Sequence, residues 1–372
     1  MTHPMLEWQE GDVTRSLRWQ SESGLRPPKR VVIADDTLNA DSAFRLASEG
    51  TGLLWRGDFQ NARQLLQALT RRIERKPRKT SDIPRESFNL HRQAQSQRAR
   101  TLGMLLVEVD ADYGIGLRRA PDIRLACNEA YGASSGAFVV PLREILGLIG
   151  AHEWRRKGVE IAELEARIHP WYGVFSPIRG EYLALIADAP LPARTLAFDI
   201  GTGTGVIAAL LAKRGVQEVV ATDCDARALS CARDNLGRLD LLDRVKIVEV
   251  DLFPPGRAPL VVCNPPWIPA RPNAAIERAI YDPDSAMLRG FLSGLKDHLT
   301  PQGEGWLILS DLAEHLQLRT REELLQWIAD AGLKVIARMD TRPTHARAAD
   351  QADPLHEARA KEVTSLWRLA TA

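Results

Sequence analysis

The residues best suited to chemistry follow an apolar run, Ala258–Cys263, and read Asn264-Pro265-Pro266-Trp267. The amide oxygen of Asn264 and the carbonyl of Pro265 can each accept one hydrogen of a planar NH2 group. Pro265 and Pro266 hold the turn rigid, because each ring fixes φ near about −65°. Trp267 adds a flat ring that would stack on a planar acceptor, or else close the loop against the core. Alone, the four residues also fit an ordinary loop after a strand.

A glycine-rich turn upstream makes a site more specific. Phe198-Asp199-Ile200 runs into Gly201-Thr202-Gly203-Thr204-Gly205, which opens a helix. Glycines let the backbone turn sharply and let a ligand approach it closely, and the helix start offers unpaired N–H groups. The glycines alternate, unlike the GxGxxG spacing of dinucleotide enzymes. This pattern favours a cationic amine beside Asp199 over a pyrophosphate cradle.

Acidic residues also end the next two apolar segments. Asp223 follows Asp199 at close to the roughly 20-residue spacing at which an acid holds ribose hydroxyls, and Asp225 is a nearby competitor for that role. Asp251 ends the third segment, where its carboxylate could accept from an exocyclic adenine amine. Leu252 and Phe253 follow it and would sandwich the ring.

The residues at the ends of these apolar segments must be held in place by a regular fold. Residues 166–372 show the sequence pattern of such a fold. Strands are expected at 195–200, 218–222, 245–250, 260–263, 305–309, 333–339 and 363–369, with helices at about 205–214, 226–238, 285–299 and 320–331. Such alternation predicts an α/β fold, a largely parallel sheet with helices on both faces. Ligands of such sheets bind at the carboxyl ends of the strands, where the strand order switches.

The N-terminal part is organised differently. Residues 1–29 are polar and interrupted by Pro and Gly, which predicts a flexible arm, and residues 30–165 alternate like a separate α/β domain. Between Arg63 and Arg100 the chain carries 11 basic and 3 acidic residues. That stretch either faces phosphates on RNA or is a solvated helix surface with a linker. The net charge of +1 for the whole chain favours the second interpretation.

Composition sets the broad class. The 372 residues suit about two domains, and 45% hydrophobic with 26% charged residues is ordinary for a globular protein with an ample core. The four cysteines form no pair with metal-binding spacing, so reduced thiols, a cytoplasmic location and no metal are expected. No apolar stretch approaches the roughly 18 residues of a membrane span, and no secretory signal is evident.

From about Thr195 to Leu369 the chain resembles class I S-adenosylmethionine-dependent methyltransferases. The Asn-Pro-Pro-aromatic turn resembles that of the amino-methylating branch, which includes release-factor glutamine N5-methyltransferases and amino-methyltransferases of ribosomal RNA and DNA. The resemblance implies a Rossmann-like, seven-stranded, mostly parallel sheet with the last strand antiparallel, preceded here by an additional N-terminal α/β domain. Trp267 stands where Tyr or Phe is commoner.

The resemblance also implies roles for individual residues. The methionine part of S-adenosylmethionine would be held by the glycine turn, the ribose by Asp223, and the adenine by Asp251 with Leu252. Asn264 and Pro265 would hold the substrate nitrogen, with Pro266 and Trp267 completing the turn. The segment Tyr281–Leu295 is similar to the stretch after this motif in glutamine-methylating members. The residues implied for the glycine turn are Asp199, Gly201, Thr202, Gly203 and Gly205.

The expected function is therefore transfer of a methyl group to a planar amino or amide nitrogen. The acceptor is expected to be protein glutamine or a ribosomal RNA base rather than a small metabolite, with residues 30–165 recognising the substrate and no membrane partner. Three alternatives stay open: a catalytically silent scaffold that binds RNA or protein, a methyltransferase of a small metabolite, and a nicotinamide-dependent dehydrogenase.

An aromatic segment before the first expected strand, residues 167–177, has two interpretations. His169, Trp171, Tyr172 and Phe175 would either line the acceptor pocket or pack the domain interface. Arg179 is expected to be a surface ion-pair partner.

Overall fold

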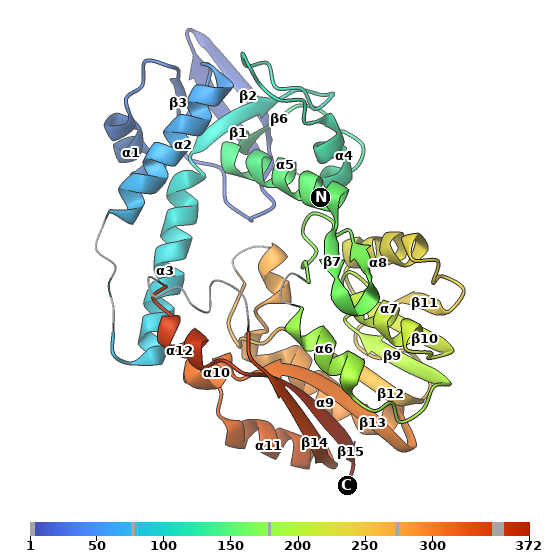
Figure 1. Ribbon diagram of the computed structural model, residues 1–372. Coiled ribbons are helices and arrows are strands. Elements are labelled where there is room, and N and C mark those ends of the chain that lie inside the picture. The colour runs from blue at the N-terminus through green and yellow to red at the C-terminus, as the bar shows by residue number, and fades with distance from the viewer. Residues whose placement is uncertain (1–3, 76–78, 80, 178–179, 273–274, 344–352) are drawn as a thin grey trace. The chain divides into compact units, whose positions relative to one another are not determined.

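The computed structural model describes residues 4–75, 79, 81–177, 180–272, 275–343 and 353–372 (Figure 1). The chain forms two compact units. The first contains most residues up to 80 together with residues 89–153, and the second contains residues 81–88, 154–272 and 276–372. The division therefore falls at residues 153/154, earlier than the predicted 165/166. A small antiparallel pair, β7 (Val159–Ile161) and β8 (Ala166–Ile168), belongs to the second unit.

The second unit is built on a seven-stranded sheet in the order β11-β10-β9-β12-β13-β15-β14. The neighbouring pairs β11–β10, β10–β9, β9–β12 and β12–β13 are parallel. Strand β15 is antiparallel to both β13 and β14. The predicted α/β alternation with a mostly parallel sheet is confirmed. The strands are β9 (Leu196–Ile200), β10 (Glu218–Asp223), β11 (Val245–Glu249), β12 (Ala258–Cys263), β13 (Leu299–Ser310), β14 (Leu333–Thr341) and β15 (Thr364–Thr371).

Helices cover both faces of this sheet, because successive strand residues point to opposite sides. Ala197 and Val262 pack with α6 (Glu181–Asp188), α7 (Val206–Lys213) and α8 (Ala226–Arg238). Phe198 and Val261 pack on the other face with α9 (Ala286–His298) and α11 (Arg321–Asp330). Figure 1 shows α6 and α7 on one side of the strands and α9 on the other. Two short helices, α10 (Leu312–His315) and α12 (His356–Lys361), complete the unit.

The strand order changes direction at β9. This strand pairs with β10 on one side and with β12 on the other, and the β9–β12 pairing aligns Ile200 with Cys263. Because both strands run the same way, the residues that follow them emerge side by side at the carboxyl edge. The switch point of an open α/β sheet is where such folds bind ligands.

The first unit contains a mixed six-stranded sheet in the order β1-β2-β6-β5-β4-β3. Its parallel part is β3 (Arg30–Ala34), β4 (Thr51–Trp55) and β5 (Leu105–Val109), followed by the antiparallel β6 (Phe138–Pro141). Helix α2 buries one face, including Phe59 and Leu69. The helices of this part of the chain are α1 (Ala40–Ser48), α2 (Phe59–Glu74), α3 (Pro84–Leu102), α4 (Arg124–Tyr131) and α5 (Leu142–Lys157).

The prediction of a flexible arm at residues 1–29 is wrong for residues 5–19. They form the antiparallel hairpin β1 (Met5–Glu10) and β2 (Val13–Trp19), and β2 joins the sheet beside β6. Leu6 and Trp8 alternate with polar residues and pack with Trp19 in a buried cluster. This period of two is the signal of a half-buried strand, and the polar composition around it concealed the pattern.

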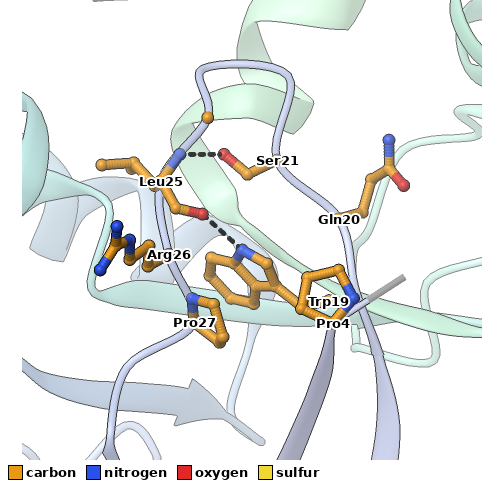
Figure 2. A pocket seen from close by; sticks show the side chains of 8 residues that line it. Pro4, Trp19, Gln20, Ser21, Leu25, Arg26 and Pro27 are labelled. Atoms are coloured by element: carbon orange, nitrogen blue, oxygen red, sulfur yellow. Dashed lines mark hydrogen bonds between the residues drawn. The ribbon is translucent and has the colours of Figure 1, made fainter. Parts of the chain in front are cut away.

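The loop after β2 is also ordered. The Glu144 carboxylate accepts hydrogen bonds from Ser21 Oγ (2.8 Å), Ser23 Oγ (2.5 Å) and the Glu22 backbone N–H (2.8 Å). The indole N–H of Trp19 donates to the Leu25 carbonyl at 2.7 Å, as Figure 2 shows. A cavity of about 680 Å³ lies beside this loop, lined by Pro4, Trp19, Gln20, Ser21, Gly24, Leu25, Arg26 and Pro27.

A partly buried ion pair ties β13 to β15, and its loss should destabilise the second unit. Arg368 donates from Nε and Nη2 to the Glu304 carboxylate at 2.8 and 2.6 Å, and the Trp306 indole donates to the same group at 2.9 Å. Removing Glu304 leaves the half-buried Arg368 guanidinium and the buried Trp306 N–H without this acceptor. We therefore expect Glu304→Ala to lower the free energy of unfolding by about 1.5–3 kcal/mol, measured by urea denaturation followed by circular dichroism.

The matched control is Asp243→Ala, because Asp243 is exposed. Its effect should stay within about 0.5 kcal/mol. A loss of stability in Glu304→Ala no larger than that of the control would contradict the structural role of the pair.

Candidate functional site

The glycine turn takes the conformation that its sequence demands. Gly201, Gly203 and Gly205 have φ values of 72°, 56° and 81°, a region that residues with a side chain rarely occupy. A methyl group added at Gly203 would meet no atom within 4 Å, so the backbone there borders open space. Gly205 begins α7, where an added methyl group would lie 3.3 Å from Ala232. The turn thus leaves Gly203 open to a ligand, while Gly205 packs against α8.

Asp199 lies at the end of β9 and is completely buried. One carboxylate oxygen, Oδ2, accepts from Thr202 Oγ1 at 2.6 Å and from the Ala208 N–H at 3.1 Å. The other, Oδ1, is buried and has no hydrogen-bond partner among the described residues. Burial raises the pKa of Asp199 to about 7, and the charge of Asp223 adds to the rise. A cationic hydrogen-bond donor at Oδ1 would offset both the missing hydrogen bond and the unfavourable burial of the negative charge.

Asp223 joins the second strand tip to the glycine turn. Its Oδ2 accepts from the Gly203 N–H at 3.0 Å and its Oδ1 from the Asp225 N–H at 2.9 Å. Burial raises the pKa of Asp223 above its usual range. Asp225 caps α8 by accepting from the Arg227 N–H at 2.8 Å. Of the two acids proposed for the ribose, Asp223 is therefore the one that borders the glycine turn.

The third tip is more open. Asp251 is exposed, and Leu252 has φ +63° with its carbonyl accepting from Thr222 Oγ1 at 2.7 Å. Phe253 stacks on Phe291 and His298 of α9, with ring centroids 5.8 and 4.3 Å apart. The Phe253 ring is thus engaged by α9, which differs from its expected position beside a ligand ring.

Asn264 follows β12 beside the start of the glycine turn, because Cys263 is in register with Ile200. The indole N–H of Trp267 donates to Asn264 Oδ1 at 2.9 Å. An indole N–H can only donate, so this bond identifies the oxygen end of the amide. Trp267 is half-buried, and its ring packs against three buried clusters. The interaction between Trp267 and Asn264 was not predicted from the sequence.

Tyr182 is a second residue that sequence reasoning missed. It lies in α6, is buried, and its hydroxyl is close enough to the Asn264 side chain to affect the Tyr182 pKa. Burial, followed by the charge of Asp199, raises the pKa of Tyr182 above its usual range, although the Asn264 side chain opposes the rise. Asn264, Tyr182 and Asp199 are therefore neighbours. The only sequence signal was an aromatic residue at the start of the helix that precedes β9.

The turn after Asn264 is held by the segment before α9. Ile268 pairs with Tyr281, and the Asp282 N–H donates to the Ile268 carbonyl at 2.9 Å. No described residue donates a hydrogen bond to the Pro265 carbonyl. Pro265 is buried and Pro266 half-buried, so the carbonyl side of this turn is fixed by packing.

Helix α9 closes the same edge of the sheet. The Asp282 carboxylate accepts from the Met287 and Leu288 N–H groups at 3.0 and 3.1 Å. The Met287 Cε atom lies 2.7 Å from the position that a methyl group on Gly201 would take. The segment 281–295 thus packs directly on the glycine turn.

The aromatic segment 167–177 packs on α8 in part. The His169 N–H donates to Asn235 Oδ1 at 2.7 Å, and the Trp171 indole donates to Asp234 Oδ2 at 3.0 Å. These two residues therefore pack against α8 within the second unit, while Phe175 is 38% exposed. Arg179 lies outside the described residues. Within the part of the chain that the structure describes, no group of three or more His, Cys, Asp or Glu could hold a metal ion.

The comparisons with known proteins agree with this geometry. Residues 171–324 match the family model described as methyltransferase small domain. That stretch contains the glycine turn, all three acidic tips and the Asn264–Trp267 turn. The resemblance to methyltransferases indicated by the sequence is confirmed. Among the described residues, no helix has both the length and the apolar character needed to cross a membrane.

Three curated relatives are similar over part of the chain. A release factor glutamine methyltransferase of Thermosynechococcus vestitus is 28% identical, covering 47% of this chain and 62% of its own length. A tRNA1(Val) (adenine(37)-N6)-methyltransferase of Bacteroides thetaiotaomicron is 29% identical, covering 33% and 56%. A second release factor glutamine methyltransferase, from Cereibacter sphaeroides, is 34% identical, covering 34% and 50%. The chain thus spans less than two thirds of each relative.

Gly203→Ala should separate ligand binding from folding. The added methyl group meets no protein atom, so the protein should fold, with only about 1–2 kcal/mol of backbone strain from the left-handed conformation. The same methyl group would occupy the space that a ligand of the turn needs. We expect at least a roughly tenfold loss of S-adenosylmethionine affinity by calorimetry, because close approach to the backbone is what glycine permits. Unchanged affinity would contradict the assignment of this turn.

Asp199 should make ligand binding depend on pH. Because its folded-state pKa is raised to about 7, Asp199 carries a proton at pH 5 and must release it to face a cation. Affinity for S-adenosylmethionine should therefore rise with pH up to about 7, by up to roughly tenfold per pH unit, and then level off. The stability of the ligand-free protein should fall as pH rises toward about 7, because the unfolded chain releases this proton near pH 4 while the folded protein retains it, and should level off above pH 7.

Calorimetry in buffers of different ionisation enthalpy measures the released proton directly. Asp199→Asn should bind weakly and without this pH dependence, whereas Asp243→Asn, at an exposed site, should behave like the wild type. A wild-type affinity that does not change between pH 5 and 7 would contradict the assignment.

Proposed function

We propose that the second unit transfers a methyl group from S-adenosylmethionine to a planar amino or amide nitrogen of a macromolecule. The observation that carries the proposal is the Asn264 amide, whose oxygen is oriented by Trp267 beside the glycine turn. A catalytically silent scaffold would have no physical need for this oriented amide next to a buried carboxylate with an unpartnered oxygen.

The residues at the carboxyl edge fit the proposed cofactor. The unpartnered Oδ1 of Asp199 suits an ammonium group, and the open face of Gly203 admits a ligand close to the backbone. Asp223 would accept from ribose hydroxyls, and Asp251 with Leu252 would contact the adenine. When bound, S-adenosylmethionine supplies an electrophilic methyl group on a sulfonium.

The acceptor nitrogen would be held by two carbonyl groups. Asn264 Oδ1 accepts one hydrogen bond from Trp267 and keeps a second lone pair for an acceptor N–H. The Pro265 carbonyl would take the other N–H. Two such bonds draw a conjugated nitrogen toward tetrahedral geometry and turn its lone pair toward the methyl carbon. Positioning of this kind can be worth roughly 7–11 kcal/mol, so we assign no general base.

Trp267 would serve the acceptor in two ways. Its N–H orients Asn264. Phe and Tyr, the commoner residues at this position, have no ring N–H that could do so. Its partly exposed ring would border the acceptor, as the sequence predicts. Tyr182, buried in α6, would be a further neighbour of this amide. The nitrogen forms its new bond to carbon as the carbon–sulfur bond breaks, and the surplus proton leaves to water.

The first unit would recognise the acceptor rather than bind a second cofactor. The acids at the ends of its parallel strands are already engaged: Asp35 accepts from Thr37, Asp36 from the Asp58 N–H, and Asp58 from two arginines. The basic stretch 63–100 belongs largely to this unit, although Lys76 and Arg78 lie outside the described residues. Relatives named for release-factor glutamine and for tRNA adenine support a macromolecular acceptor.

A labelling experiment tests the proposal. Purified protein is incubated with S-adenosylmethionine carrying a labelled methyl group and with separate RNA and protein fractions of a cell extract. We expect label in one macromolecular fraction. Asn264→Ala should bind the cofactor normally yet lose at least roughly 100-fold in transfer, since it removes a positioning contact.

Asp243→Ala, an exposed substitution in the second unit, is the control and should transfer label normally. Label confined to small metabolites would refute the macromolecular acceptor. Full transfer by Asn264→Ala would refute the role of the amide.

A further inference from the structure

Arg319 is a buried arginine without a hydrogen-bond partner for part of its side chain. It lies in the connection between α10 and α11, at the carboxyl edge of β13, and is 3% exposed. Its Nε and Nη2 atoms are buried and unpartnered among the described residues. Burying an unpaired charged donor is costly, so such groups in native proteins usually have a function or an external partner.

The carboxylates that act on Arg319 are engaged elsewhere. Glu314 accepts from Arg321 Nε at 2.8 and 3.0 Å, Asp282 caps α9, and Glu323 accepts from the Thr320 N–H at 2.7 Å. Burial lowers the pKa of Arg319, although the charges of Glu314 and Asp282 oppose this. Negative charges thus outnumber the positive charge of Arg321 near the guanidinium, yet Nε and Nη2 have no oxygen partner among the described residues.

Arg319 belongs to the surroundings of the Asn264 turn. Its neighbour Leu318 packs in one cluster with Trp267, Ile268 and Tyr281. Asp282 links the two regions, because its charge acts on Arg319 and its N–H donates to the carbonyl of Ile268, in the turn after Asn264, at 2.9 Å. Gln317 and Thr320 on either side of Leu318 and Arg319 are exposed, so the connection itself lies at the surface.

The two unpartnered donors define the ligand chemistry. Nε–H and the nearer Nη2–H of a guanidinium point the same way in one plane, which matches two oxygens of a single phosphate or carboxylate. A lysine ammonium cannot make this planar double contact. A neutral amide offers one oxygen and would leave one donor unpaired.

We propose that Arg319 binds a phosphate group of an RNA acceptor, close to the nucleotide whose amino group reaches Asn264. The inference rests on the proposed methyl transfer and narrows its acceptor to RNA. Phosphate is favoured over carboxylate by the exposed basic side chains of the stretch 63–100, among them Arg71, Arg75 and Arg100. Phosphate contacts fix the register of a nucleic acid on a protein, so Arg319 is a positioning residue for the acceptor.

The first test compares Arg319→Lys with Arg319→Gln on pooled unmodified transcripts of ribosomal and transfer RNA. Both variants should raise KM for RNA by roughly 10- to 150-fold, the effect of losing a charged hydrogen-bonded contact. Their affinity for S-adenosylmethionine should equal that of the wild type. Arg319→Gln alone should reduce the slope of log affinity against log salt, by about 0.7 for one phosphate of a single strand.

Arg233→Lys, at an exposed position of α8, is the matched control and should leave KM unchanged. A wild-type KM in Arg319→Lys would overturn the double contact. Label that enters protein but not RNA would overturn the phosphate assignment while the proposed methyl transfer stands. No label in either fraction, with wild-type protein, would refute the methyl transfer itself.

A second measurement needs no variant that might unfold. Wild-type protein methylates RNA carrying random single phosphorothioates, and methylated molecules are separated and sequenced. Phosphorothioates within a few nucleotides of the methylated base should be depleted, because sulfur disturbs a two-oxygen contact. An even distribution around the methylated base would overturn the proposal.

Discussion

The pairing of β9 with β12 is the constraint on which the site depends. These strands are distant in sequence order, with β10 and β11 between them, yet they are neighbours in the sheet with Ile200 opposite Cys263. The pairing places a glycine turn and an amide side by side without any direct bond between the two loops. A slip of one residue would turn the side chains of β12 to the other face of the sheet.

Around this pair, the protein keeps polar groups buried and only partly satisfied. Asp199 leaves one oxygen without a partner, and Arg319 leaves two donors without one. Both groups cost stability in the isolated protein, and both lie at the carboxyl edge where ligands of such sheets bind. By contrast, the strand-tip acids Asp35, Asp36 and Asp58 of the first unit accept hydrogen bonds from their surroundings. The edge of the second unit therefore has buried polar atoms free to bind a ligand, whereas the carboxylates named in the first unit are already hydrogen-bonded.

Much of the second unit could be predicted from local sequence. Short apolar runs ending in Asp, Gly or Asn indicated the strands and their tips, because strand ends and turns have strong residue preferences. Contacts between distant segments could not be read this way. The bond from Trp267 to Asn264 depends on the fold of the turn, and the position of Tyr182 depends on the packing of α6. Arg319 appeared in the sequence as one of many arginines, and only its burial distinguishes it.

The errors have equally physical causes. The hairpin at residues 5–19 was missed because its alternating pattern is short and surrounded by polar residues. Phe253 was expected beside a ligand ring because it follows a strand tip, and its stacking on Phe291 and His298 of α9 was not foreseen. In both cases packing partners far along the chain decided the outcome.

Hydrogen exchange with and without S-adenosylmethionine tests the central claim most directly. If the β9–β12 pairing forms one ligand site, the amides of residues 199–205 and those after residue 264 should slow together when the ligand is added. Slower exchange at only one of the two turns, or only in the first unit, would contradict the account.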